Sequence, residues 1–365
     1  MTILVLGGIG FIGRNFVASL LSKGVPAGDI RVVDKCIPAT AWLSESHKAA
    51  IDQVEFRQAN LVNPASIEKA FARDDGKPWD AVVNLAAETK YSQSESVYEE
   101  KIVLLSVHCA KEAAKQKAGV FIEVSTAQVY DGEKKAWDES GKIKPWTGIA
   151  KAKAKAEDEL KKIAGLNLII VRPAIVYGPG DIQGITPRLI CGHVYRHLKQ
   201  EMKLLWTKDL RINTVHVDDV SGALYALAEH YKDKPANAEV YNLADKQDTD
   251  QETINTHIRA IFGIETGFQG SIISQFAKLN LDSVVEDVND AHMGPWSELL
   301  KSSSIANSPL TPYLDQELLY NNHLQIVGNK IESVPGFTYT VPNVTEAKVR
   351  EVVDGYKQQG IWPNN

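Results

Sequence analysis

The amino-acid sequence predicts an α/β protein built on a doubly wound parallel sheet, and three observations support this prediction. Short β-branched segments alternate with amphipathic helical stretches through the first half of the chain. These segments are apolar through most of their length, as strands covered on both faces must be. A glycine-rich turn follows the first of them directly.

The expected elements follow one another as strand, helix, strand. The strands are expected at residues 2–7, 30–34, 54–59, 81–86, 120–125 and 168–172. Helical periodicity falls between them, at residues 12–23, 67–72, 97–117 and 147–163. A further strand and helix are expected within residues 214–228 and a late strand at 240–243, whereas residues 245–365 appear irregular and rich in Ser, Asn and Pro.

Composition sets limits on the class of protein. The 365 residues are 44% hydrophobic and 24% charged, which excludes a disordered chain and a disulfide-stapled miniprotein. A net charge of -6 gives no reason to bind nucleic acid or an anionic membrane. Three unpaired cysteines, no leader-like start and no membrane-length apolar run predict a soluble cytoplasmic protein with a small-molecule partner.

The glycine-rich turn predicts a nucleotide site. Gly7, Gly10 and Gly13 are spaced three apart between an apolar strand and a helix, where a tight turn and close backbone approach require residues without Cβ. The helix that follows directs its free N–H groups and positive dipole end at an anion. Asp34 ends the second strand, where a carboxylate binds adenosine ribose hydroxyls and repels a 2′-phosphate, so NAD is favoured over NADP, although the adjacent Lys35 weakens that preference.

These features predict two domains. Residues 1–177, with a return segment at 214–245, form the Rossmann-type NAD-binding domain. Residues 178–213 and 246–365 form a smaller substrate lobe.

Seven ordered motifs give the chain a family resemblance. They are Gly7-x-x-Gly10-Phe11-Ile12-Gly13, Asp34, Asn60-Leu61, Asn84-Leu85-Ala86-Ala87, Ser125-Thr126-x-x-Val129-Tyr130, Arg172-Pro173-x-x-Val176-Tyr177-Gly178-Pro179-Gly180 and Val215-His216-Val217-Asp218-Asp219-Val220. In this order they resemble the extended short-chain dehydrogenases, the NAD-dependent epimerase/dehydratase group. The resemblance implies NAD as cofactor and, by analogy, a homodimer formed through helices 97–117 and 147–163.

The resemblance also implies roles for single residues. Asn60 and Leu61 flank the adenine, Leu85, Ala86 and Ala87 line the path to the nicotinamide, and Pro173 and Val176 lie near its amide. Together with the glycine turn and its neighbours, the implied cofactor residues are Gly7, Gly10, Phe11, Ile12, Gly13, Asp34, Lys35, Asn60, Leu61, Leu85, Ala86, Ala87, Lys153, Pro173 and Val176.

The expected catalytic set has a conspicuous gap. The resembled family uses a hydroxyl after the fifth strand, matched by Thr126, and a Tyr-x-x-x-Lys helix, in which the tyrosine is the general acid/base. Lys153 matches the lysine, but Ile149 stands where the tyrosine belongs. Lys101 likewise stands where the family usually carries a relay asparagine.

Helical spacing singles out Lys153 among the neighbouring lysines. Counted at 100° per residue, Lys153 shares an apolar face with Ile149 and Ala156, whereas Lys151 and Lys155 lie on the opposite face. A lysine on a buried face needs a partner, and the nicotinamide ribose is the expected one; a snorkelling lysine is the alternative.

Three interpretations of the missing tyrosine remain open. Another group supplies the acid, with Tyr91, Tyr130, Lys101 and Glu88 as candidates; or the reaction needs no strong acid; or the chain binds the nucleotide without redox catalysis. Glu88, Tyr91, Thr126 and Arg188 are the expected substrate contacts. The segment from His216 to Asp219 does not converge metal ligands, so no metal site is expected, and Asp218 and Asp219 are expected to cap a helix.

The sequence therefore predicts an NAD-dependent epimerase/dehydratase-like oxidoreductase acting on a small organic molecule, either a sugar nucleotide or a secondary metabolite. The alternatives are a non-redox lyase or isomerase on the same fold and a non-catalytic NAD(P)-binding regulator.

Overall fold

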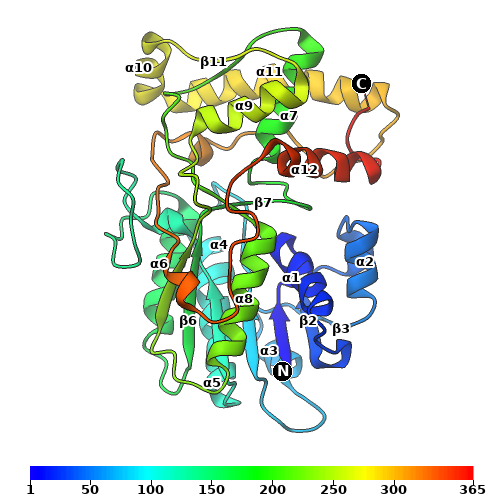
Figure 1. Ribbon diagram of the computed structural model, residues 1–365, viewed down its shortest axis with the longest axis vertical. Helices are drawn as coiled ribbons and strands as arrows, with labels where there is room; N and C mark the ends of the chain where they lie inside the picture. Colours follow the sequence, from blue (N-terminus) through cyan, green and yellow to red (C-terminus); the bar gives the residue numbers. More distant parts are fainter. Residues whose placement is uncertain (365) are drawn as a thin grey trace.

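A seven-stranded parallel sheet forms the centre of the protein (Figure 1). The computed structural model describes residues 1–364, apart from the side chains of residues 271 and 272. The strand order is β10-β6-β5-β4-β1-β2-β3. The strands are β1 (Ile3–Leu6), β2 (Ile30–Asp34), β3 (Glu55–Gln58), β4 (Ala81–Asn84), β5 (Val120–Val124), β6 (Leu168–Pro173) and β10 (Glu239–Leu243).

This order confirms the doubly wound fold. The chain winds from β1 through β2 to β3 on one side and from β4 through β5 to β6 on the other. The direction therefore reverses between β1 and β4, and a doubly wound sheet opens its ligand crevice at the carboxyl ends of the strands on either side of such a reversal.

Helices cover both faces of the sheet because successive strand side chains point to opposite sides. Ile3 and Val5 pack with residues of α1 (Phe11–Ser22) and α8 (Val217–Tyr231), whereas Leu4 and Leu6 pack with α3 (Pro64–Phe71) and α5 (Leu105–Lys115). The remaining helices of this part are α2 (Glu45–Ile51), α4 (Glu95–Tyr98) and α6 (Gly148–Leu160).

The helix expected at residues 97–117 is not regular. Between α4 and α5 the chain forms a π-helical turn, η3 (Glu99–Leu104). The Lys101 carbonyl accepts a hydrogen bond from the backbone N–H of Glu88, 3.3 Å away in the loop after β4. Such wide turns are frequent at functional sites, and this one joins the helix to a loop that borders the ligand crevice.

The region expected to be irregular, residues 245–365, is largely helical, so that expectation was wrong. It contains α9 (Gln251–Phe262), α10 (Ser271–Leu279), α11 (Leu281–Ser302) and α12 (Glu346–Gln358), which join α7 (Thr186–Leu198) in the upper lobe of Figure 1. Ile254, Ile258 and Phe262 pack with α7 in a second core that includes Trp296 and Trp362. Tertiary burial of these spaced apolar residues outweighs the polar composition between them.

Two small parallel sheets lie apart from the central sheet: β7 (Ile175–Tyr177) pairs with β9 (Thr214–His216), and β8 (Met202–Leu204) pairs with β11 (Thr266–Phe268).

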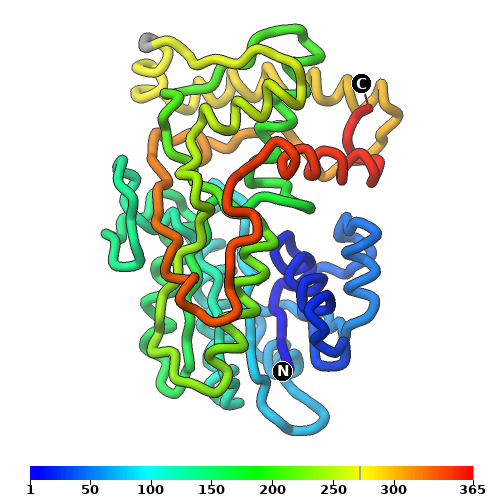
Figure 2. The backbone as a smooth tube through the Cα atoms, viewed as in Figure 1, coloured from blue at the N-terminus to red at the C-terminus, as the bar shows by residue number. Residues whose placement is uncertain are grey.

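A long segment leaves the lobe, runs down beside the sheet domain and returns to α12, as the orange-to-red trace in Figure 2 shows. Ile331, Val334 and Phe337 of this segment belong to the core formed by α1 and α8. Asp219 fixes its return by accepting hydrogen bonds from the backbone N–H groups of Thr340 (2.6 Å) and Val341 (3.1 Å). The residues expected in the lobe thus partly pack on the sheet domain.

The prediction that Asp218 and Asp219 cap α8 was wrong. The His216 ring caps the helix, because its Nδ1 accepts from the Asp218 N–H at 3.2 Å. Asp219 instead binds residues 340 and 341, since that segment presents backbone donors that would otherwise be buried without partners.

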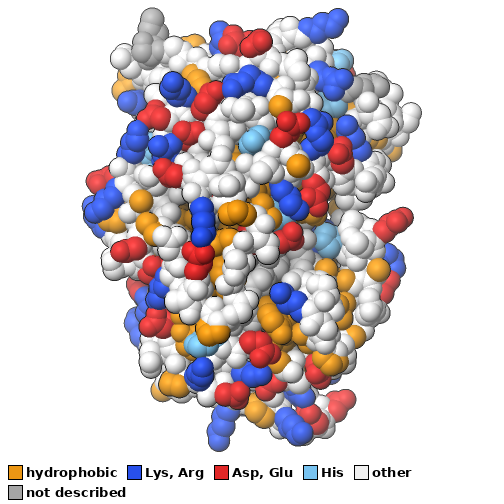
Figure 3. Space-filling view, in the orientation of Figure 1, with side chains coloured by type: hydrophobic (Ala, Val, Ile, Leu, Met, Phe, Trp, Pro, Cys, Tyr) orange, Lys and Arg blue, Asp and Glu red, His pale blue; other side chains and the backbone are white. Residues whose placement is uncertain are grey.

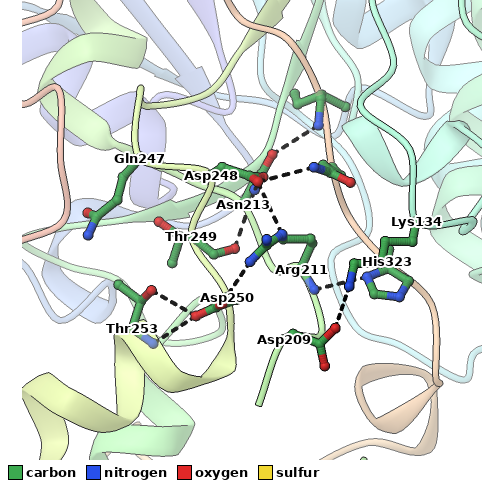
Figure 4. Close-up of polar contacts among 12 residues, drawn as sticks. Lys134, Asp209, Arg211, Asn213, Gln247, Asp248, Thr249, Asp250, Thr253 and His323 are labelled. Atoms are coloured by element: carbon green, nitrogen blue, oxygen red, sulfur yellow. Dashed lines mark hydrogen bonds and ion pairs between the residues drawn. The ribbon is translucent and has the colours of Figure 1, made fainter. Parts of the chain in front are cut away.

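Polar contacts around Arg211 join the chain segments that connect the sheet to the lobe (Figure 4). Its Nη1 donates to the Asp250 carboxylate at 2.7 Å, and its Nε lies 3.1 Å from the Asp248 carboxylate. The Arg211 backbone N–H donates to Nδ1 of His323 at 3.1 Å. The side chain and backbone of Arg211 therefore join three segments that are far apart in the sequence.

The surface carries basic and acidic side chains interspersed, as Figure 3 shows for one face. Over residues 1–364, no helix is both long and apolar enough to cross a membrane. Cys36, Cys109 and Cys191 are all free thiols, as expected.

A buried ion pair between α6 and β6 generates a stability prediction. Arg172 and Glu157 are 3% and 2% exposed, and both Nε and Nη2 of Arg172 donate hydrogen bonds to the Glu157 carboxylate. Arg172→Met leaves a buried carboxylate without its cation, so we expect a loss of about 3–5 kcal/mol in the free energy of unfolding. Urea denaturation measures it.

Arg350→Met is the matched control, because Arg350 pairs with Glu346 at the surface of α12. It should change the free energy of unfolding far less. Equal losses in the two variants would contradict the assignment of Arg172 to a buried network.

Candidate functional site

One large cavity opens at the carboxyl ends of the strands. Its volume is about 730 Å³, and it extends from the glycine-rich turn to the lobe. Every residue that the sequence resemblance assigns to the cofactor lines it: Gly7, Gly10, Phe11, Ile12, Gly13, Asp34, Lys35, Asn60, Leu61, Leu85, Ala86, Ala87, Lys153, Pro173 and Val176.

The glycine-rich turn has the tight geometry that its sequence predicts. Gly7 has a left-handed backbone (φ 74°), and a Cβ there would lie 2.6 Å from the Ala86 nitrogen. A Cβ on Gly13 would lie 2.5 Å from the Gly7 carbonyl oxygen. Any side chain at either position would push β1, α1 and the loop after β4 apart, and the first turn of α1 would no longer border the cavity.

Arg14 adds positive charge to this turn, and sequence reasoning missed it. Its guanidinium donates to the carbonyls of Ile9 (2.8 Å), Ala41 (2.9 Å) and Trp42 (3.0 Å). Burial lowers the pKa of Arg14, against the opposing effects of Tyr356, Cys36 and Asp34. Because these hydrogen-bond partners are neutral carbonyls, the charge adds to the α1 dipole and favours an anion. The position of Arg14 directly after Gly13 was the sequence signal that could have identified it.

Asp34 is held at the cavity edge by two backbone donors. One carboxylate oxygen accepts from the Ile9 N–H at 3.1 Å and the other from the Cys36 N–H at 2.9 Å. Each oxygen keeps further acceptor capacity. The arrangement suits two ribose hydroxyls, and the ribose contact itself stays a prediction.

Lys153 lies on the buried face of α6, which confirms the helical spacing argument. It is 5% exposed, whereas Lys151 and Lys155 are exposed and Lys155 pairs with Glu99. Its ammonium lies 2.9 Å from Oε1 of Glu123 and 2.7 Å from the Val124 carbonyl. The sequence analysis missed Glu123 because the residues around it form an apolar strand. An ammonium has three protons, so one remains for a ligand, and the ribose contact stays a prediction.

The structure brings Ile149 to the cavity but does not bring Tyr130. Tyr130 is 2% exposed; its hydroxyl donates to Asn242 and accepts from Arg172, both at 2.8 Å. It is absent from the cavity lining. The hydroxyl of Tyr130 therefore joins β6 to β10 inside the fold, and Tyr130 does not line the cavity.

Tyr91 does reach the cavity, close to the turn that carries Thr126. The side-chain amide nitrogen of Gln128 donates to the Tyr91 hydroxyl over 3.5 Å. The side-chain oxygen of Gln128 accepts a hydrogen bond from the Thr147 hydroxyl at 2.9 Å. Burial raises the pKa of Tyr91, and the Gln128 contact opposes that rise only in part. The phenol consequently stays protonated at neutral pH. Thr126 Oγ1 accepts from the Gln128 N–H at 3.2 Å.

Glu88 and Lys101 form an ion pair on the same cavity wall, with 3.5 Å between Lys101 Nζ and Glu88 Oε2. Burial alone would raise the pKa of Glu88, but backbone N–H groups of Lys90 and Thr89, with the charges of Lys35 and Lys101, lower it overall. Glu88 is thus a carboxylate at neutral pH.

The lobe closes the cavity beside position 149. Glu317, in the turn η5 (Gln316–Leu319), accepts from the Gly148 N–H at 2.8 Å, and Asp315 accepts from Ser92 Oγ at 2.8 Å. Leu318 lines the cavity. These contacts hold the lobe against α6 and the loop after β4.

Arg188 is the one expected substrate residue outside the cavity lining. It lies in the first turns of α7, and its Nη1 is buried without an acceptor. Burial lowers the pKa of Arg188 to about 10, with Cys191 opposing. Its substrate contact remains a prediction.

Fold and site together define a dinucleotide-binding α/β protein with a second ligand space beneath a helical lobe. The chain belongs to the NAD dependent epimerase/dehydratase family, whose model matches residues 3–244. The described residues hold no cluster of three or more His, Cys, Asp or Glu fit for a metal ion.

Two curated relatives match about half of this chain. The chain is 28% identical over 191 residues to a dTDP-glucose 4,6-dehydratase of Streptomyces niveus, covering 49% of this chain and 55% of the relative. An enzyme of the same name from Actinoplanes sp. is 29% identical over 192 residues, covering 49% and 58%. The chain thus matches somewhat more than half the length of each relative.

Solved structures share the whole fold. UDP-glucuronic acid 4-epimerase from Bacillus cereus, in complex with UDP-glucuronic acid and NAD, matches with TM-score 0.68 and 19% identity, covering 98% of this chain and 99% of that one. The dTDP-glucose 4,6-dehydratase DesIV from Streptomyces venezuelae, as a double mutant with NAD bound, matches with TM-score 0.67 and 20% identity, covering 99% of both. At these identities the similarity establishes the fold.

The lysine assignment gives a binding prediction. Lys153→Ala should weaken NADH binding roughly tenfold or more, because it removes a charged hydrogen-bond donor from the cavity wall. Lys151→Ala and Lys155→Ala, on the exposed face of α6, should leave it unchanged. Nicotinamide fluorescence titration measures all three, and equal losses would count against the cavity role of Lys153.

Proposed function

We propose that this protein is an NAD-dependent enzyme that oxidises and rearranges a sugar nucleotide, as an epimerase or dehydratase. The observation that carries the proposal is the single cavity. It joins the nucleotide-binding turn to Thr126, Tyr91 and Glu88, so a cofactor and a second ligand would share one continuous space.

The residues present fit NAD. Asp34 would hold the adenosine ribose, the first turn of α1 with Arg14 would face the diphosphate, and Lys153 would hold the nicotinamide ribose. When bound, NAD supplies a hydride acceptor for a substrate alcohol. Asp34 also repels a 2′-phosphate, and the charge of Lys35 acts on Glu88, which supports NAD over NADP.

The proposed proton donor and proton acceptor are not the residues that the resembled family uses. Ile149 cannot exchange a proton, and Tyr91 is the phenol that lines the cavity near Thr126. Oxidation of a substrate hydroxyl releases its proton, and the Glu88 carboxylate, fixed by the backbone N–H groups of Thr89 and Lys90 at 3.1 Å each, would accept that proton. The protonated Tyr91 would donate a hydrogen bond to the reacting oxygen, with Thr126 as a second contact, and would supply the proton when the carbonyl is reduced again. Lys101 would hold the Glu88 charge in place.

The sugar nucleotide is proposed from the relatives, which are named for dTDP-glucose. A contact of Arg188 with this substrate stays a prediction, because Arg188 lies outside the cavity lining. We also propose a homodimer through the η3–α5 and α6 surfaces and a cytoplasmic location, the latter supported by three free thiols. The proposed domains are residues 1–177 with 214–245, and a lobe of 178–213 and 246–365.

Incubation with a panel of UDP- and dTDP-hexoses tests the function. Turnover by mass spectrometry or nuclear magnetic resonance, with transient absorbance at the nicotinamide band, is the expected result. A protein that binds neither NAD⁺ nor NADH contradicts the proposal. Turnover without any involvement of the nicotinamide would favour a non-redox enzyme instead.

Tyr91→Phe tests the proton donor. We expect turnover to fall about 10²-fold with cofactor affinity unchanged, because the variant loses only the hydroxyl. Tyr130→Phe is the matched control for chemistry, since its hydroxyl serves the buried support network. Because the raised pKa keeps the Tyr91 phenol protonated, the wild-type protein should lose activity through ionisation of this phenol only above pH 10. An unchanged rate in Tyr91→Phe would remove this residue from the mechanism.

A further inference from the structure

A carboxylate is buried directly beneath the proposed nicotinamide end of the cavity. Glu123 lies in β5, at the centre of the sheet, and is 0% exposed. Its neighbours along the strand, Ile122 and Val124, are apolar core residues. A buried charge in such a place is costly unless it is paired, so its partners show what it serves.

Each oxygen of Glu123 has a partner that is itself buried. Oε1 accepts from Lys153 Nζ at 2.9 Å and from Ser106 Oγ at 3.0 Å, and Oε2 accepts from Asn84 Nδ2 at 2.6 Å. Lys153 is the cation among them. Glu123 therefore cancels the charge of the lysine that lines the cavity.

The network continues to the cavity wall. Asn84, at the end of β4, accepts with its side-chain oxygen from the Ala86 N–H at 3.2 Å, and Ala86 lines the cavity. Cys109 is the further titratable group close to Glu123. Burial, reinforced by the Glu123 charge, raises the pKa of Cys109 well above its usual value, so its thiol stays neutral. The local charge is thus the sum of Lys153 and Glu123, which is zero.

We propose that Glu123 is a positioning residue that neutralises Lys153 and thereby favours the oxidised cofactor. This inference rests on the proposed function. An isolated ammonium beside the nicotinamide ribose disfavours NAD⁺, whose ring is cationic, relative to the neutral ring of NADH. The Glu123–Lys153 pair removes that penalty, and its low-dielectric surroundings make the removal effective. Glu123 also fixes the lysine side chain so that one proton of its ammonium faces the cavity.

The ratio of the dissociation constants of NADH and NAD⁺ tests this inference without requiring turnover. NADH is titrated by fluorescence, and NAD⁺ by competition with NADH. Glu123→Gln leaves the site with one net positive charge, so the preference for NAD⁺ over NADH should fall about fivefold or more. Lys153→Met leaves the opposite charge and should shift the ratio the other way, although both affinities weaken.

Two further variants separate charge from structural damage. Ser106→Ala removes a neutral hydrogen bond to Glu123 and keeps both charges, so the ratio should stay at the wild-type value. The double variant Glu123→Gln/Lys153→Met is again neutral, and its ratio should return toward wild type. Thermal unfolding establishes which variants fold. If Glu123→Gln does not fold, the ratios of Lys153→Met and of the double variant test the effect of the net charge.

The outcomes are distinguishable. Ratios that follow the net charge of the pair support the inference. A ratio unchanged across the charge variants, in a wild-type protein that binds both cofactors, overturns the role of Glu123 and leaves the proposed function standing. Wild-type protein that binds neither cofactor overturns both.

Discussion

The cavity of this protein depends on two buried ion pairs that anchor α6 to the centre of the sheet. Lys153 of α6 pairs with Glu123 of β5, and Glu157, one turn further, pairs with Arg172 of β6. Loss of one partner from either pair lowers the stability of the fold, because the remaining charge would lack its counter-ion. The helix that faces the proposed reaction centre is consequently fixed in rotation as well as position, with Ile149 turned to the cavity.

The two pairs differ in what they do. Arg172 and Glu157 also bind Tyr130 and Ser125, and of these four residues Ser125 alone lines the cavity. In the other pair the charged lysine itself lines the cavity. The Arg172–Glu157 pair therefore mainly supports the packing of α6 on the sheet, and the Lys153–Glu123 pair places a charge at the ligand space. The two candidate tyrosines differ in the same way: Tyr130 binds Arg172 in the buried network, and Tyr91 lies on the cavity wall.

The lobe completes the site from a distance in the sequence. Glu317 reaches the N-terminus of α6, and Tyr356 and Ile361 line the cavity from the C-terminal end of the chain. Arg211, between Asp248 and Asp250, holds the crossing segments that set the lobe on the sheet. The proposed substrate space is thus bounded by groups from both ends of the chain, which restricts the size and charge of the molecule it accepts.

The sequence by itself determined the doubly wound sheet, the glycine turn, Asp34 and the buried face of Lys153, because each follows from local periodicity or from a short motif with one geometry. Tertiary structure alone decided the rest. The helices α9, α11 and α12 form because α7 and Trp362 bury their spaced apolar residues, a contact that no local pattern shows. Glu123 could not be identified as a partner of Lys153 from a strand that appears apolar, since the pairing joins residues that are close only after the sheet and α6 pack together.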